Sequence, residues 1–497
     1  MRATDPAFLS ASAAAEAIGA GRLSPVDLVE ALLARIDAHE AKLHAFVAVY
    51  GDDARLAAEA AHKAIRAGHA VGPWHGVPIA LKDIIDLEGR ITMGGSKHWA
   101  RRVSKLTATL ARRLIAAGMI VIGKTHTVEF AMGGWGTNRQ LGTPWNPWDL
   151  DTHRTPGGSS SGSGVATAAR LAPWAIGTDT GGSVRLPSSW CGLTGLKTTI
   201  GRISVHGVLP LAPTMDTPGP MARTVEDAAR LFNLLQGPDP DDPLTLRHPP
   251  DDPLPALRRG VAGLRLGVLA EAERAGIDAE VLAAYDAAAE TLAGLGARID
   301  PLSLPRSSED YGAMVGKLIG AEGYSFVGEL VDDASLPLDD DVRPRIQVGR
   351  DISATAYLRL LREREACKRA ALTAIEGFDA WLTPTTATPA LALDAVDQTT
   401  TPARFTRPVN LLDWCALAMP NGATGGGLPI SLQVVCRGHD EATALRIGWA
   451  YQQATDWHNR LPPGPRPLTR RASPPRAGAR PVTVPCAWSQ RYRSIRR

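Results

Sequence analysis

Two short loops rich in glycine and serine dominate the interpretation of this sequence: residues 155–164 read TPGGSSSGSG and residues 177–187 read GTDTGGSVRLP. Between them, residues 163–171 are predicted to form a helix, and residues 174–176 are a short apolar run that is typical of a strand. Each loop directly adjoins a predicted element. We therefore interpret the two loops as parts of one site.

Three other interpretations of the first loop are weaker. A flexible Gly/Ser linker would not open directly into a helix. A phosphate-binding loop would carry Gly-Lys-Ser/Thr after its glycines, and this loop does not. Residues 158–162, GSSSG, fit the G-x-S-x-G pattern of a nucleophile elbow, but that turn follows a buried strand. Here the preceding residues 149–154, DLDTHR, are polar and turn-like, which disfavours the elbow.

Predicted helices and apolar strand-like runs alternate along most of the chain. Helices are predicted from Pro25 onward and over residues 53–68 and 105–117. The predicted strands are residues 76–83, 119–122, 174–176, 264–269, 380–382 and 430–435. This alternation is typical of an α/β fold in which helices cover both faces of a sheet.

Composition excludes several classes of protein. The 497 residues are 44% hydrophobic and 21% charged, which is too apolar for a disordered chain. The 54 basic and 51 acidic residues leave a formal charge of +3, so we expect neither nucleic acid nor a membrane surface as a partner. The five cysteines form no CxxC pair, and the sequence shows no signal peptide or membrane-spanning run, so we expect a cytoplasmic protein.

Two segments differ in composition from the rest. Residues 237–260 hold seven prolines and mark either a linker between domains or a long crossover within one domain. Residues 461–497 hold nine arginines and eight prolines but no lysine and no acidic residue. No helical or alternating period runs through this second segment, so we predict an Arg/Pro-rich disordered tail.

Together with further motifs, the paired loops resemble the amidase signature family of Ser–Ser–Lys hydrolases. The matching motifs are residues 76–83 (GVPIALKD), 146–148 (NPW), 191–197 (CGLTGLK), 216–220 (DTPGP) and 427–430 (GLPI). The resemblance implies one large α/β/α layered domain over residues 1–460, with a mixed central sheet covered by helices. It places the signature core at about 70–230 and makes residues 237–260 a crossover.

The resemblance also implies a catalytic triad. By position, Ser183 corresponds to the nucleophile, Ser159 to a bridging serine after a cis Gly158–Ser159 peptide, and Lys82 to the base. A serine hydroxyl needs a neighbouring base, and no histidine here lies in a recognisable catalytic motif. Lys82 ends an apolar run, where burial would lower its pKa enough for this role.

Further residues near the second loop are candidates for support. The backbone N–H groups of Thr180, Gly181, Gly182 and Ser183 are expected to form an oxyanion hole. Asp179 and Arg185 are expected to pair and to support the nucleophile through structure or charge. Ser160 is expected to donate a hydrogen bond to the bridging serine.

The substrate pocket is less well marked in the sequence. Met132, Gly133, Gly134 and Trp135 precede the first loop and are candidates for its lining. For Trp135 we favour packing over stacking on a substrate. Residues 305–345 are a candidate lid.

These residues predict hydrolysis of a small-molecule amide, and also of esters or carbamates, through an acyl-enzyme. The alternative is the A subunit of a glutamine-dependent aminoacyl-tRNA amidotransferase, which supplies ammonia to a partner. We expect neither a cofactor nor a metal, and we expect a monomer or a homodimer.

Overall fold

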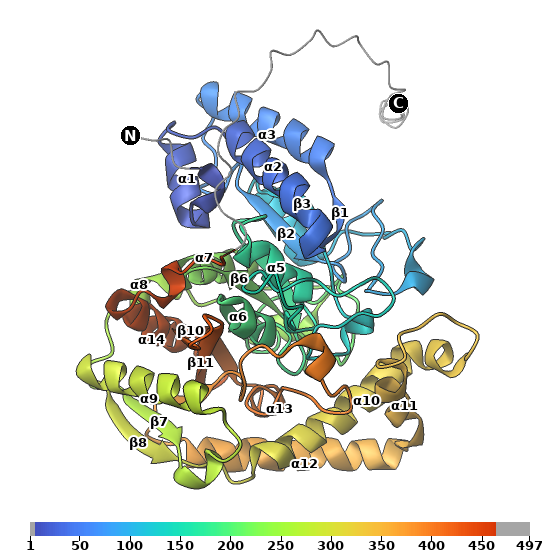
Figure 1. Cartoon of the computed structure of the whole chain (residues 1–497), viewed down its shortest axis with the longest axis vertical. Coiled ribbons are helices and arrows are strands. Elements are labelled where there is room, and N and C mark those ends of the chain that lie inside the picture. Colours follow the sequence, from blue (N-terminus) through green and yellow to red (C-terminus); the bar gives the residue numbers. More distant parts are fainter. Residues whose placement is uncertain (1–4, 464–497) are drawn as a thin grey trace. The chain divides into compact units, whose positions relative to one another are not determined.

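One mixed sheet runs through the chain. The computed structural model describes residues 5–463, and within them eleven strands pair in the order β1-β3-β2-β4-β6-β5-β10-β11-β9-β7-β8 (Figure 1). The strands are β1 (Phe46–Val49), β2 (Pro78–Lys82), β3 (Ile120–Thr125), β4 (Ala175–Asp179), β5 (Thr194–Lys197), β6 (Thr217–Ala222), β7 (Arg265–Leu269), β8 (Arg298–Leu302), β9 (Ala380–Pro384), β10 (Cys415–Ala423) and β11 (Pro429–Cys436). The sheet combines parallel pairs such as β2/β3 with antiparallel pairs such as β10/β11.

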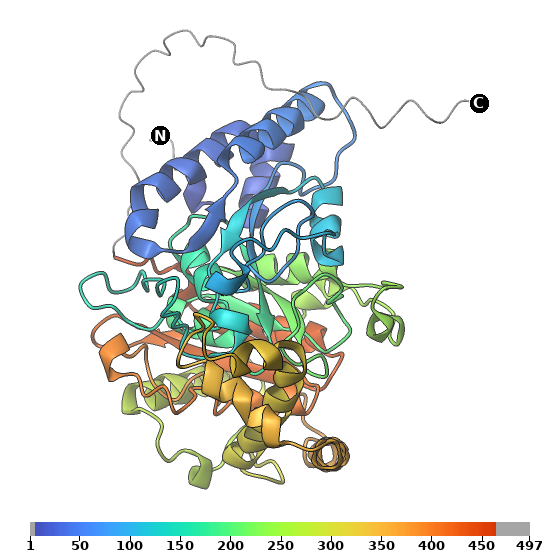
Figure 2. The same cartoon turned by 90° about the vertical axis from the view of Figure 1, so that its right-hand side faces the viewer.

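Helices connect these strands and gather over them. They are α1 (Ala11–Gly19), α2 (Pro25–Leu43), α3 (Gly51–Arg66), α4 (Thr109–Ala116), α5 (Ser161–Ala168), α6 (Arg185–Cys191), α7 (Val225–Leu235), α8 (Leu254–Leu257), α9 (Ala279–Gly294), α10 (Ser308–Asp332), α11 (Arg343–Gln347), α12 (Ala354–Ala374), α13 (Arg407–Leu411) and α14 (Glu441–Ala454). The helices α1–α3 lie at the end of the sheet that carries β1, and α10–α12 lie at the opposite end (Figures 1 and 2).

Both faces of the sheet are covered. On one face, Gly448 of α14 packs against Leu417 and Met419 of β10. Ala418 points to the other face because side chains alternate along a strand. Its cross-strand partner Gly195 of β5 lies against Ser188 of α6. The expected α/β/α layering with a mixed sheet is therefore confirmed.

Two neighbouring parallel strands position the site. The strands β2 and β4 are buried along their whole length, as their apolar runs predicted, and Leu81 is in register with Ile176. Because the strands are parallel, their carboxyl ends meet at one edge of the sheet. Lys82 ends β2 there, and the glycine-rich loop after Asp179 begins beside it.

The predicted elements agree with the structure apart from their bounds. The run 76–83 forms β2, the run 119–122 forms most of β3, and the helix expected over 163–171 is α5 (Ser161–Ala168). This helix ends early because Arg170 has a φ of 59°, a left-handed conformation that stops helix growth.

The two segments of unusual composition differ in what can be described. Residues 237–260 contain α8. The Gly237 carbonyl accepts from Arg113 and the Pro249 carbonyl accepts from Arg202, so the segment is packed within the compact unit Met1–Arg466. Most of the predicted tail, from residue 464 on, lies outside the described residues. No helix within residues 5–463 has both the length and the hydropathy needed to cross a membrane.

Candidate functional site

Lys82 lies at the centre of the candidate site, at the carboxyl end of β2. Its side chain is fully buried, and its Nζ donates to Ser159 Oγ at 2.7 Å and to Thr178 Oγ1 at 2.8 Å. Burial lowers the pKa of Lys82 to about 7, although the nearby charges of Asp216 and Asp179 partly oppose this fall. A lysine with this pKa is partly neutral near pH 7 and can accept a proton.

The first serine loop holds Ser159 against this lysine. The Gly158–Ser159 peptide bond is cis. The carbonyl of Ser159 accepts hydrogen bonds from Thr127 Oγ1 at 2.9 Å and from the Val128 N–H at 3.2 Å. A Cβ on Gly158 would come within 2.4 Å of the Gly133 carbonyl oxygen, so only glycine fits at this position. The loop is thus held in place at Gly158 and at Ser159.

Ser183 lies in the second loop, between β4 and α6, and faces a cavity. It is 8% exposed, whereas Lys82 and Ser159 are completely buried. The Ser160 N–H donates to the Ser183 carbonyl oxygen at 3.3 Å, which joins the two loops. Among the described residues, no hydrogen bond joins the hydroxyls of Ser159 and Ser183. The structure therefore brings the three predicted triad residues together, with only Ser183 open to a substrate.

The backbone of the second loop differs from the prediction at one residue. The Gly182 N–H donates to Asp179 Oδ1 at 2.8 Å, so it is occupied and does not belong to a free row of four donors. Within residues 5–463, the N–H groups of Thr180, Gly181 and Ser183 have no acceptor. These three N–H groups stay open, and Gly181 and Ser183 are among the residues of the loop that line the cavity beside the Ser183 hydroxyl, where an oxyanion hole would need donors.

Behind Ser183, Asp179 and Arg185 form a fully buried ion pair, with Nη2 2.9 Å from Oδ1. Burial alone would raise the pKa of Asp179, but the charge and hydrogen bonds of Arg185 hold it well below its usual range. The other Arg185 donors reach Asn410 Oδ1, Gln433 Oε1 and the Thr406 carbonyl. The carboxylate also accepts from Val184 N–H. Every charge and donor in this cluster therefore has a partner.

Ser160 has a different role from the predicted one. Its hydroxyl donates to the Thr178 carbonyl at 3.3 Å and accepts from the Thr178 N–H at 3.2 Å. It therefore ties the first loop to β4 and forms no hydrogen bond with Ser159. The reason is that the Ser160 side chain packs against Gly177 and Thr178 of β4, whose backbone groups occupy its hydroxyl.

Sequence reasoning missed several groups around Lys82, Ser159 and Ser183. The hydroxyl of Thr178 accepts a hydrogen bond from Lys82 Nζ at 2.8 Å. Asp216 is half-buried, its charge acts on Lys82, and it accepts a hydrogen bond from Thr180 Oγ1 at 2.5 Å. It is the first residue of the DTPGP motif, which was the sequence signal that could have identified it. Asn410 donates to Asp179 Oδ1 at 2.9 Å, but nothing in its local sequence indicates this contact.

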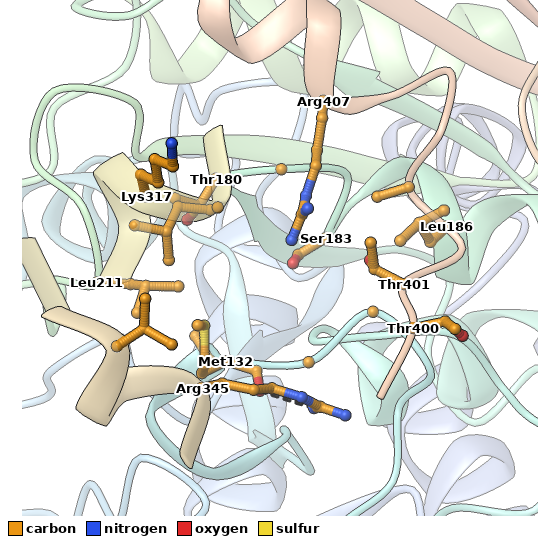
Figure 3. A pocket seen from close by; sticks show the side chains of 18 of the residues that line it. Met132, Thr180, Ser183, Leu186, Leu211, Lys317, Arg345, Thr400, Thr401 and Arg407 are labelled. Atoms are coloured by element: carbon orange, nitrogen blue, oxygen red, sulfur yellow. Dashed lines mark hydrogen bonds between the residues drawn. The ribbon is translucent and has the colours of Figure 1, made fainter. Parts of the chain in front are cut away.

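The cavity in front of Ser183 has a volume of about 350 Å³ (Figure 3). One wall is formed by Met132, Gly133 and Gly134, as predicted from their position before the first loop. Another part of the wall comes from α10 within the stretch 305–345, where Lys317 contributes. Further lining residues that sequence reasoning did not identify are Leu186, Leu211, Arg345, Thr400, Thr401 and Arg407.

Trp135 is the exception among the predicted lining residues. Its ring stacks on Trp190 at a centroid separation of 5.5 Å, and its Nε1 donates to the Thr400 carbonyl at 3.1 Å. The side chain is 7% exposed and does not line the cavity. It packs behind the wall because the neighbouring indole provides a flat apolar surface.

Comparison with known proteins agrees with this architecture. The Amidase family matches residues 27–445. The A subunit of the glutamyl-tRNA(Gln) amidotransferase of Geobacter metallireducens is 38% identical over an alignment of 468 residues that covers 88% of this chain and 95% of that protein.

Solved structures superpose closely. The native peptide amidase from Stenotrophomonas maltophilia has a TM-score of 0.80 at 28% identity, covering 93% of this chain and 99% of its own. A 6-aminohexanoate cyclic dimer hydrolase has a TM-score of 0.82 at 26% identity, covering 93% of this chain and 100% of its own. The chain therefore belongs to the amidase signature family and is a hydrolase of amide C–N bonds.

Proposed function

We propose that this chain hydrolyses small-molecule amides through Ser183, Ser159 and Lys82 by way of an acyl-enzyme. The observation that carries the proposal is the position of Lys82, which is buried, 2.7 Å from Ser159 Oγ, and has a pKa lowered to about 7. A general base works best when its pKa lies near the working pH. Esters and carbamates are further candidate substrates because they form the same kind of tetrahedral intermediate.

The first half-reaction begins with attack by Ser183 Oγ on the scissile carbonyl. Its proton passes to Ser159 while Ser159 gives its own proton to neutral Lys82. The negative oxygen that develops is held by the N–H groups of Gly181 and Ser183. Lys82 then returns a proton through Ser159 to the leaving amine, and the acyl group remains on Ser183.

In the second half-reaction, water attacks the ester carbonyl of the acyl-enzyme. Ser159 and Lys82 take its proton by the same route and return one to Ser183 as the C–O bond breaks. The buried pair of Asp179 and Arg185 keeps the loop in place during both steps, because Asp179 accepts from the N–H groups of Gly182 and Val184.

The proposal is tested by trapping the acyl-enzyme. The full chain is mixed with a slowly deacylated aryl ester, and the protein mass is measured. We expect one added acyl group on the unmodified protein and on the control Ser335→Ala, an exposed serine far from the loops in sequence. We expect none on Ser183→Ala. Acylation or amide turnover by Ser183→Ala would refute the assignment of the nucleophile.

A second candidate function rests on the 38% identity to the A subunit of a glutamyl-tRNA(Gln) amidotransferase. In that case the ammonia released from glutamine would pass to a partner protein. The purified chain alone is assayed for ammonia release from glutamine and primary aliphatic amides, and for release of the corresponding amine from anilides and carbamates. Turnover of simple amides by the chain alone supports the amidase. Activity that depends on added partner proteins supports the amidotransferase.

A further inference from the structure

The cavity in front of Ser183 is strongly cationic. Lys317, Arg345 and Arg407 line it, and none of the described residues that line it is acidic (Figure 3). The uncharged lining is made of small or apolar residues together with threonine hydroxyls. A cavity with this lining favours a ligand that carries negative charge.

Of the three cations that line the cavity, Arg407 reaches closest to Ser183 (Figure 3). It begins α13 and extends toward Ser183 in Figure 3. Its side chain crosses Gly181, where an added Cβ would lie 3.5 Å from Arg407 Cγ and 3.9 Å from Nε. On its other side it passes Gly312 and Gly316 of α10. The guanidinium therefore lies over the loop that holds the open N–H donors.

Arg407 has no counter-ion. Its Nη1 donates to the Gly312 carbonyl at 3.1 Å, and no carboxylate among residues 5–463 pairs with it. Burial and the like charge of Arg345 lower the pKa of Arg407 to about 10, which still leaves it cationic at neutral pH. A half-buried cation without a partner is unfavourable unless a ligand supplies the missing charge.

Arg345 is less available to a ligand than Arg407. Its Nη2 donates to the Gln398 carbonyl and to Gln398 Oε1, and its Nη1 donates to the Met132 carbonyl. The charges of Asp341 and Asp339 also act on it. Lys317 is exposed at the α10 wall. These two cations add positive potential, while Arg407 offers unused donors.

We propose that Arg407 binds a carboxylate of the substrate, so that the enzyme prefers amides that carry a carboxylate within reach of the scissile bond. The proposal rests on the proposed function, because it assumes that the amide carbon lies at Ser183. A guanidinium suits this role since its planar donors match the two oxygens of a carboxylate. The carboxylate belongs to either the acyl part or the amine part of the amide.

The test compares anionic and neutral amides on the purified full chain. Succinamate carries the carboxylate on the acyl side, N-acetylglycine carries it on the amine side, and butanamide carries none. We expect a higher kcat/KM for one of the two anionic amides than for butanamide. Equal or better turnover of butanamide than of both would overturn the proposal without using any variant.

The Arg407→Gln variant then assigns the preference to this residue. For the preferred anionic amide we expect kcat/KM to fall about 30- to 100-fold, mainly through KM, with less than about a threefold change for butanamide. Arg407→Lys should recover part of the loss because it restores the charge without the planar donors. The exposed Arg359→Gln serves as the matched control. Equal losses for charged and neutral amides would show that Arg407 acts on the reaction itself, and would overturn the proposal.

A binding measurement separates this proposal from the proposed function. Succinate is titrated calorimetrically into Ser183→Ala and into the Ser183→Ala/Arg407→Gln double variant. Binding to the first and its loss in the second support the carboxylate site even if no amide is turned over. Failure of turnover with intact succinate binding counts against the proposed function alone. Equal binding to both proteins, or binding to neither, overturns the carboxylate site.

Discussion

Arg185 and Arg407 contact the same loop, which follows β4 and carries Ser183, yet their surroundings differ completely. Arg185, behind the loop, is fully buried, and its donors reach Asp179, Asn410, Gln433 and a backbone carbonyl. Arg407, in front of the loop, has one backbone partner and no carboxylate among the described residues. A buried charge that serves the fold is neutralised within the protein. A charge left unpaired in a cavity is available to a ligand.

The same difference separates Lys82 from the cavity in front of Ser183. The groups behind the loop are held by short contacts with one another, as in the 2.7 Å contact of Lys82 with Ser159. In front of the loop, Arg345 and Arg407 donate mostly to backbone carbonyls, and both side chains also line the cavity. The region behind should therefore control chemistry and stability, while the region in front should control which substrate is used.

The largest effect on activity is expected at Lys82, the proposed base. Lys82→Met should lower kcat for any amide by at least about 10³-fold, because no other group can take the serine proton. Steady-state kinetics with an anionic and a neutral amide measure this loss, which should be equal for both. The exposed Lys105→Met is the control. A loss confined to the anionic amide would mean that Lys82 belongs with the cavity cations.

Breaking the buried pair should mainly affect stability. Arg185→Met leaves the Asp179 carboxylate buried without its partner, which should lower the free energy of unfolding by about 3–5 kcal/mol. Unfolding in denaturant measures this loss of free energy of unfolding. In contrast, Arg407→Met should change the free energy of unfolding by less than about 1 kcal/mol, because that guanidinium forms no ion pair. Equal costs for the two substitutions would remove the distinction between the regions.

The pH dependence tests the state of Lys82. Its pKa is lowered to about 7 in the folded protein, so kcat/KM for a neutral amide should rise about tenfold per pH unit below that value and level off above it. The unfolded chain keeps this lysine protonated up to its ordinary pKa of 10.5. Between these values the unfolded state binds more protons, so the Lys82 contribution to stability increases with pH.

The stability difference between the unmodified protein and Lys82→Met, measured at pH 7 and at pH 9, isolates this contribution. It should shift in favour of the unmodified protein at the higher pH. An activity profile that stays flat between pH 6 and pH 8 would contradict a base of lowered pKa.

The smallest effect is expected at the cavity mouth. Lys317 is exposed, so Lys317→Met should raise KM for the preferred anionic amide only about two- to threefold at low salt. This difference should disappear near 0.5 M salt because surface charges are screened. KM of the unmodified protein and of Lys317→Met, measured at two salt concentrations, shows whether salt removes the difference. A salt-independent change would mean that Lys317 contacts the carboxylate directly.

The sequence alone predicted the features that depend on short stretches of the chain. The apolar runs of β2 and β4 and the helix between the two serine loops follow from periodicity within short stretches. Lys82, Ser159 and Ser183 were singled out as candidates by the resemblance of their motifs to the amidase signature family. Burial of Lys82 also followed, because the lysine ends a strand that is apolar throughout.

The tertiary structure decided everything that depends on contacts between distant segments. Asn410 and Gln433 reach Arg185 across more than two hundred residues of sequence. The Gly182 N–H is not a free donor, because it donates to the side chain of Asp179. Trp135 stacks on Trp190, a contact between distant segments. Arg407 lines the cavity from the five-residue helix α13, and no pattern in the sequence indicated this position. Local pattern determines which segments become helices and strands, whereas packing alone determines which polar groups are paired and which remain open to a substrate.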